Sequence, residues 1–146
     1  MKRKFLIAYD GSELSEKMVK EVKLQASAVS EAEIYLLAVV GNYDVMTNYP
    51  AVARDIEREL AEKLQKDLHE IKTNLDTLDN ASVYAEVFID HTHRNAGRAI
   101  VEYASEKDVN LILIGSHGLG GFKGTILGSV SNQVVQHAEC KVLLVK

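Results

Sequence analysis

Short apolar runs alternate along the chain with stretches in which apolar residues recur at helical spacing. The runs are almost continuously apolar, as in strands buried on both faces, and between them apolar residues stand three or four positions apart. The predicted strands are 5–9, 34–40, 83–89, 111–114 and 142–145, and the predicted helices cover about 14–29, 52–75, 96–104 and 130–138. Such alternation predicts an α/β fold, a parallel sheet covered by helices on both faces. We expect one domain over 1–146, because no repeat or long linker interrupts the pattern.

Two of these elements carry further expectations. In the third strand, apolar positions alternate with Tyr84, Glu86 and Phe88, which indicates a less buried strand, as at a sheet edge. In the longest helix the apolar residues lie four, or once three, positions apart, and we expect this whole stripe to pack on the core. Its members are Val52, Ile56, Leu60, Leu64, Leu68, Ile71 and Leu75.

Polar residues before the helices predict where the helices begin. Ser12 or Ser15 is expected to cap the first helix, and Asn95 the third, because their side-chain oxygens can accept from first-turn amides.

Composition narrows the classes of function. The net charge is −4, and no basic stripe is visible, which argues against a nucleic-acid partner. The single cysteine, Cys140, allows no internal disulfide and is expected to be a small buried residue. The apolar run after the basic N-terminus stops at Asp10, too short for a signal peptide or a membrane span, so we expect a cytoplasmic protein without a membrane partner.

The glycine-rich segment after the fourth strand predicts a phosphate cradle. Ile112–Gly118 ends a strand in glycines, and Leu127–Ser131 opens a helix with Gly128 and Ser129. Glycine allows the main chain to come close to a phosphate, and a helix N-terminus offers unpaired amides and a favourable dipole. The hydroxyls of Ser129 and Ser131 can add donors or cap the helix.

A second loop, Asp10-Gly11-Ser12, follows the first strand. Ligands of open α/β sheets bind beyond the carboxyl ends of strands, where the strand order reverses. If the fourth strand returns beside the first, this loop meets the glycine-rich loop at that reversal. A carboxylate suits ribose hydroxyls, so Asp10 and the phosphate cradle together predict a nucleotide site.

No catalytic residue is assigned. A P-loop is absent because Lys123 stands where its second glycine belongs, and neither Gly-x-Gly-x-x-Gly nor Gly-x-Ser-x-Gly occurs. Asp10 and His117 form no recognisable triad with a nucleophile.

The spacing of Gly115-x-x-Gly118, nine residues, then Gly128-Ser129-Val130-Ser131 resembles the ATP-binding signature of the universal stress protein family. The opening at 7–12, the strand at 36–39 and the ending at 138–145 are also similar to that family. The resemblance covers essentially the whole chain.

The resemblance implies a Rossmann-like sheet of order 3-2-1-4-5 that binds ATP, or sometimes AMP or ADP, with Mg²⁺ on the phosphates. It implies that Asp10 holds the ribose, that the Val39 main chain pairs with adenine, and that the fifth strand, Val142–Val145, forms a homodimer. The base pocket would be lined by Ala8, Tyr9 and Ile114, and the phosphates held by Gly115, Gly118, Gly128, Ser129, Val130 and Ser131. His117 would also lie at the nucleotide, where it would polarise a phosphate, move a proton or only shape the loop.

One part of the chain departs from the family. The turn after the third strand often reads Gly-x-Pro-Ala, but here it is Asp90-His91-Thr92-His93-Arg94-Asn95-Ala96, which leaves its geometry open. His91 and His93 beside Asp90 suggest a metal site, although two imidazoles without further ligands do not make one, and no metal ligand is assigned.

The hypothesis from the sequence is therefore an ATP-binding universal stress protein in which nucleotide orders the segment from Gly118 to Gly128 as a stress-response or signalling switch. The rival is a slow ATPase or nucleotidyl transferase on the same fold. A third possibility is an interaction module with a vestigial pocket.

Overall fold

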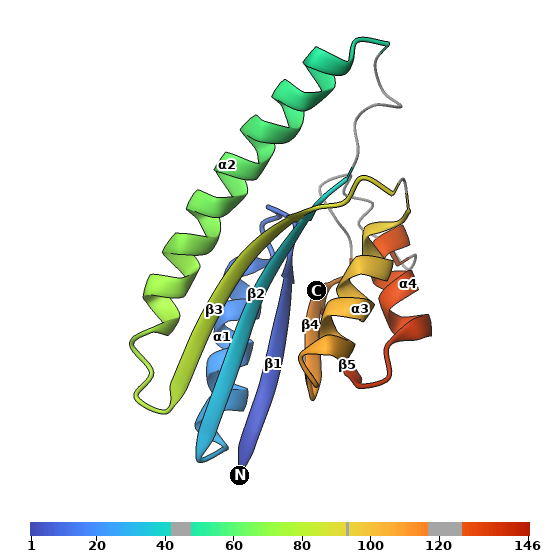
Figure 1. The fold of residues 1–146 in the computed structure, drawn as a ribbon. Helices are drawn as coiled ribbons and strands as arrows, with labels where there is room; N and C mark the ends of the chain where they lie inside the picture. Colours follow the sequence, from blue (N-terminus) through green and yellow to red (C-terminus); the bar gives the residue numbers. More distant parts are fainter. Residues whose placement is uncertain (42–47, 93, 117–126) are drawn as a thin grey trace.

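The computed structural model describes residues 1–41, 48–92, 94–116 and 127–146 (Figure 1). Within these residues, strands and helices alternate as the sequence predicts, and a single domain results. The elements are β1 Lys2–Tyr9, α1 Ser15–Ser27, β2 Glu31–Val40, α2 Pro50–Leu75, β3 Ala81–Ile89, α3 Ala96–Glu106, β4 Leu111–Gly115, α4 Ser129–His137 and β5 Lys141–Val145.

The strands form one parallel sheet in the order β3-β2-β1-β4-β5, which confirms the predicted fold. β1 lies at the centre, and the strand order reverses between β1 and β4. Ala8 near the end of β1 pairs with Leu37 of β2 on one side and Ile114 of β4 on the other. The carboxyl ends of these three strands therefore meet at the reversal, where α/β folds bind ligands.

Alternate residues of β1 build two separate cores. Phe5, Ile7 and Tyr9 point to the face covered by α1 and α2, whereas Leu6 and Ala8 point to the face covered by α3 and α4. All five residues are buried. Successive side chains of a strand point to opposite faces, so a central strand needs continuous apolar sequence to fill both cores.

The helices α3 and α4 lie close together. A Cβ built on Gly97 of α3 would stand 2.6 Å from Cβ of Gln133 and 2.9 Å from the carbonyl oxygen of Val130, both on α4. Glycine is therefore required at this crossing, because no side chain fits between the two backbones.

The third strand lies at an edge of the sheet, as predicted. Tyr84, Glu86 and Phe88 are exposed on it, and Val83, Val87 and Ile89 pack toward α2. β5 forms the opposite edge and pairs with β4.

The expected apolar stripe of α2 is wrong in its first turns. Val52 and Ile56 are exposed, whereas Ala53 and Glu57 are buried there. Steps of four residues advance 400° around a helix, so a stripe with that spacing drifts by about 40° per step and cannot stay on one face. The first turns of α2 also extend past the end of the sheet (Figure 1). The helix packs on the core mainly through Leu64, Leu68 and Leu75.

One of the two predicted helix caps is confirmed. Asn95 Oδ1 accepts a hydrogen bond of 2.8 Å from the Gly97 amide at the start of α3. α1 instead follows Leu14 and has no side-chain cap, so neither Ser12 nor Ser15 performs that role. The Ser12 amide donates to Asp10 Oδ1 at 2.9 Å, which closes a turn directly after β1.

No helix within the described ranges is both long enough and apolar enough to cross a membrane.

Candidate functional site

Three of the residues expected at the base lie on one face of the sheet. Ala8 and Ile114 are register partners, and Val39 stands two positions after Leu37, the other partner of Ala8. All three pack toward α3 and α4. Ala8 and Ile114 are buried, and Val39 is partly buried. Together they form an apolar strip across the carboxyl ends of β4, β1 and β2.

The main-chain carbonyl of Val39 is available at this edge. β1 pairs with β2 only as far as Tyr9 opposite Ala38, so Val39 lies one residue beyond the paired part of β1. The carbonyl of Val40 accepts from the Asp90 amide at 2.8 Å, on the side of β3. Successive carbonyls of a strand point to opposite sides, so the Val39 carbonyl faces the space that β1 has left.

The structure separates the side chain of Tyr9 from those of Ala8 and Ile114. Its ring belongs to the core under α1 and α2, and its hydroxyl donates a 2.9 Å hydrogen bond to Asp67 Oδ2 of α2. Burial and this contact with a carboxylate raise the pKa of Tyr9 well above its ordinary value. Only the main chain of Tyr9 lies beside Ala8 at the carboxyl edge.

Asp10 follows Tyr9 and is exposed. Its Oδ1 accepts from the Ser12 amide, which orients the carboxylate at the end of β1. Gly11 between them has a φ of 86°, a conformation that glycine adopts without strain. The Ser12 hydroxyl oxygen is buried and has no hydrogen-bond partner among the residues described.

The other side of the candidate site joins the end of β4 to the start of α4. The Gly128 amide donates to the Ser116 carbonyl at 3.0 Å, and the Ser116 amide donates to the Val145 carbonyl at 2.9 Å. The buried hydroxyl of Ser131 lies 3.0 Å from the Gly128 carbonyl and 3.2 Å from the Ser116 carbonyl. These bonds fix the N-terminus of α4 against the end of β4, directly after Gly115.

The first turn of α4 offers donors and no negative charge. Gly128 is the N-cap residue, no side chain caps the helix, and the first turn contains no acidic residue. The main-chain amide of Asn132 donates to the Gly128 carbonyl at 2.9 Å. The first intrahelical hydrogen bond thus begins at Asn132. The main-chain N–H groups before it have no acceptor within the helix; they belong to Ser129, Val130 and Ser131. Such a turn attracts anions.

Some expected residues lie outside the described part of the chain. His117, Gly118 and Lys123 fall in the segment 117–126, and His93 stands alone between two described ranges.

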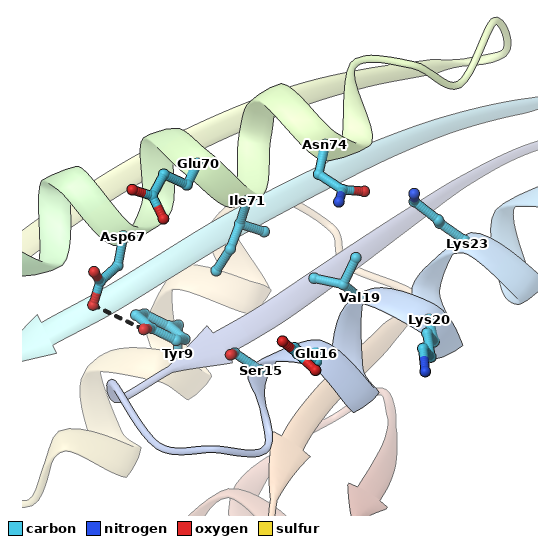
Figure 2. A pocket seen from close by; sticks show the side chains of 10 residues that line it. All are labelled: Tyr9, Ser15, Glu16, Val19, Lys20, Lys23, Asp67, Glu70, Ile71 and Asn74. Atoms are coloured by element: carbon cyan, nitrogen blue, oxygen red, sulfur yellow. Dashed lines mark hydrogen bonds between the residues drawn. The ribbon is translucent and has the colours of Figure 1, made fainter.

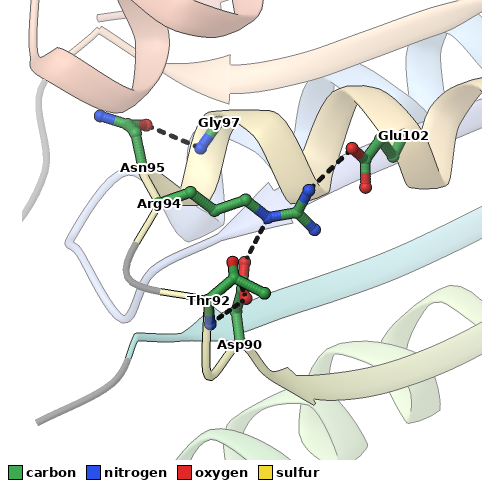
Figure 3. Close-up of polar contacts among 6 residues, drawn as sticks. All are labelled: Asp90, Thr92, Arg94, Asn95, Gly97 and Glu102. Carbon is green, nitrogen blue, oxygen red and sulfur yellow. Dashed lines mark hydrogen bonds and ion pairs between the residues drawn. The ribbon is translucent and has the colours of Figure 1, made fainter. Parts of the chain in front are cut away.

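Sequence reasoning missed a polar network where β3 ends (Figure 3). Buried Asp90 accepts from the Thr92 amide at 2.9 Å, from the Thr92 hydroxyl at 2.6 Å and from Arg94 Nε at 2.8 Å. Arg94 also donates to Glu102 of α3 at 2.7 Å. The network connects the end of β3 to α3. A carboxylate followed by threonine and arginine two and four positions later was the available signal for it.

The charge of Asp90 is strongly stabilised. Burial alone would raise the pKa of its carboxyl, but the hydrogen bonds from Thr92 and Arg94 outweigh burial and lower the pKa to about 2. Both oxygens of this carboxylate already accept hydrogen bonds from Thr92 or Arg94, which argues against a metal site shared with His91.

Cys140 is only partly buried, not fully buried as expected; it packs beside the core under α3 and α4, and burial raises the pKa of its thiol. Both observations fit the expected packing role, because a reactive cysteine needs a lowered pKa.

The geometry defines a class of protein: an open α/β domain with an anion-attracting helix N-terminus where the strand order reverses between β1 and β4, its topological switch point. Over residues 1–146 the sequence matches the model of the universal stress protein family, and the chain belongs to that family. A curated relative is the universal stress protein YxiE of Bacillus subtilis, 30% identical over 153 aligned residues that span 100% of both chains.

Solved structures share the fold. One, described as a structure-based assignment of the biochemical function of hypothetical protein MJ0577, has a TM-score of 0.84 and 26% identity, covering 99% of this chain and 95% of that one. A universal stress protein in complex with cAMP has a TM-score of 0.65 and 19% identity, covering 99% of this chain and 96% of that one. A family protein from Arabidopsis thaliana with AMP bound has a TM-score of 0.53 and 23% identity, covering 99% and 91%. At these last two identities the likeness extends to the fold alone.

Proposed function

We propose that this protein binds ATP, and also ADP or AMP, in the crevice at the β1–β4 switch point. Adenine lies on the strip formed by Ala8, Val39 and Ile114 and pairs with the main-chain carbonyl of Val39. The Asp10 carboxylate accepts from the ribose hydroxyls. The phosphates bind the main chain at Gly115 and along the first turn of α4, with His117 and Gly118 of the same loop beside them.

The observation that carries this proposal is the first turn of α4. No side chain caps the amides of this turn, and no acidic residue in it opposes the positive end of the helix dipole. Hydrogen bonds of Ser131 and Gly128 hold the turn against the end of β4. Ser131 therefore acts through its amide, because its hydroxyl is engaged by two carbonyls. That cAMP and AMP are bound by other family members supports an adenine nucleotide as the ligand.

The proposal extends to Mg²⁺, to a switch and to a dimer. Mg²⁺ would be held through the phosphates and would neutralise part of their charge. Nucleotide would order the segment from Gly118 to Gly128 and change the surface presented to other proteins in a cytoplasmic stress response.

The partner for dimerisation is a second copy at β5, because an edge strand leaves main-chain groups ready for pairing.

The test replaces Ser129 with Asp. A carboxylate in the first turn of α4 stabilises the helix by opposing its dipole, but it repels a phosphate at the same place. We expect Ser129→Asp to bind ATP at least about tenfold more weakly, equivalent to about 1.4 kcal/mol, while its melting temperature stays equal or rises. Isothermal titration with ATP, ADP, AMP and adenosine, each with and without Mg²⁺, provides the measurement.

Ser129→Asn is the matched control, because it has nearly the same shape without the charge. It should bind ATP like the unchanged protein, and adenosine should bind all three proteins equally. Equal ATP affinity in the Asp and Asn variants would place the phosphates elsewhere and contradict the proposal.

A further inference from the structure

A groove of about 450 Å³ lies between α1 and α2, on the face of the sheet opposite α3 and α4 (Figure 2). Its volume is within the range of small-molecule sites. Val19 of α1 and Ile71 of α2 form its apolar middle. The nucleotide crevice proposed above does not include these residues, so the groove is a separate feature of the fold.

The charges of this groove are ordered along its length. Glu16 of α1 and Glu70 of α2 lie toward one end, and Lys23 of α1 and Asn74 of α2 toward the other, with Val19 and Ile71 between them (Figure 2). Lys20 of α1 also lines the groove beyond Val19, but its amine points away from α2 (Figure 2). The two helices run in the same direction from the carboxyl edge of the sheet (Figure 1). At about 1.5 Å per residue, seven residues separate Glu16 from Lys23 by about 10 Å along the helix.

These four polar side chains have no partner among the residues that the structure describes. Within the described residues, neither a hydrogen bond nor an ion pair engages the side chain of Glu16, Glu70, Lys23 or Asn74. The neighbouring Asp67 differs, because it accepts from the Tyr9 hydroxyl at 2.9 Å and from Lys63 Nζ at 3.0 Å. Opposite charges therefore face the groove at its two ends without neutralising each other.

We propose that the groove binds a short zwitterionic peptide of about three residues with an apolar central side chain. Its α-ammonium group lies between Glu16 and Glu70, and its α-carboxylate accepts from Lys23 and from the amide of Asn74. Its central side chain covers Val19 and Ile71. The length follows from the charge spacing, because three extended residues span about 10 Å at about 3.3 Å each.

The test is an NMR titration of the isotopically labelled protein with the tripeptide Ala-Leu-Ala at millimolar concentration. We expect saturable shifts of the amide signals of α1 and α2 around Val19 and Ile71. The same peptide acetylated at its N-terminus and amidated at its C-terminus should bind at least about tenfold more weakly, because it has lost both charges. Equal binding of the blocked peptide, or shifts confined to other elements, would overturn the proposal.

Substitutions test each end separately. Glu70→Gln and Lys23→Gln should each weaken Ala-Leu-Ala binding by about threefold, as expected for single solvent-accessible charge pairs. Glu70→Gln should leave the affinity for the N-acetylated peptide unchanged, and Lys23→Gln that for the C-amidated peptide. Glu62→Gln and Lys66→Gln, on α2 but outside the groove, are the controls and should bind like the unchanged protein. If the controls weaken binding as much as the groove variants, only the net charge matters and the proposal fails.

Discussion

The two faces of the sheet are covered by helix pairs that differ in how closely they approach. α3 and α4 come so near that even a methyl group at Gly97 would overlap α4. α1 and α2 are separated by a groove with Val19 and Ile71 in its middle. A pair in close contact can hold a helix terminus in a fixed position, as the site after β4 requires. A separated pair leaves side-chain atoms free to contact a ligand.

The largest effect is expected where the close pair is forced apart. Gly97→Ala should destabilise the protein by about 1–3 kcal/mol, because its Cβ would lie 2.6 Å from Cβ of Gln133. Alanine in a helix would by itself be stabilising by about 0.5–1 kcal/mol, so a net loss reports the overlap with α4. Urea denaturation measures the free energy of unfolding.

Gly41→Ala is the control for this substitution. A Cβ there meets no atom of the described residues within 4 Å, so stability should change by less than about 0.5 kcal/mol. Equal effects of the two substitutions would show that the approach of α3 and α4 is not a limiting contact.

The next effect concerns the connection between β3 and α3. Because the pKa of Asp90 is about 2 in the folded protein, below its ordinary value of 3.8, the stabilisation is complete above about pH 5 and is lost progressively as the pH falls toward 2. Its size should be about 2 kcal/mol. Urea denaturation at several pH values from 5 to 2 should show this loss, and in Asp90→Asn the part due to this carboxyl should be missing. Identical pH profiles would contradict the role given to Asp90.

The smallest effect on stability is expected on the face of the sheet covered by the separated pair, α1 and α2. Tyr9→Phe removes the hydrogen bond from β1 to Asp67 of α2 and should destabilise the protein by about 1 kcal/mol. Asp67 keeps its ion pair with Lys63, which limits the loss. Tyr84→Phe is the control, because Tyr84 is exposed and should tolerate the change. If both variants melt at the same temperature, the Tyr9–Asp67 contact does not stabilise the wall of the groove.

The sequence was sufficient for the fold because its central strands contain almost continuously apolar runs. A central parallel strand such as β1 must fill two cores, and only a continuous apolar run does so. The exposed positions of β3 likewise marked an edge. α2 was less predictable, because spacing alone did not show which face of its first turns packs inward: Ala53 and Glu57 are buried there, and Val52 and Ile56 are exposed.

The candidate site was predictable where it depends on the main chain. The glycines and serines after β4 indicated a helix N-terminus, and the described part of that segment forms one. Side-chain placement was harder. Ala8 and Tyr9 were expected in one pocket although adjacent strand residues must point to opposite faces. The close approach at Gly97 depends on how two helices cross, which no local pattern encodes.

Adjacent residues of β1 belong to the two different regions. Ala8 lies in the strip of the proposed nucleotide crevice, and the ring of Tyr9 lines the groove between α1 and α2. The peptide unit between them is the shortest covalent path from one region to the other. Any ligand that shifts or twists this unit therefore changes both regions in the same step, without a relay of side chains through the core.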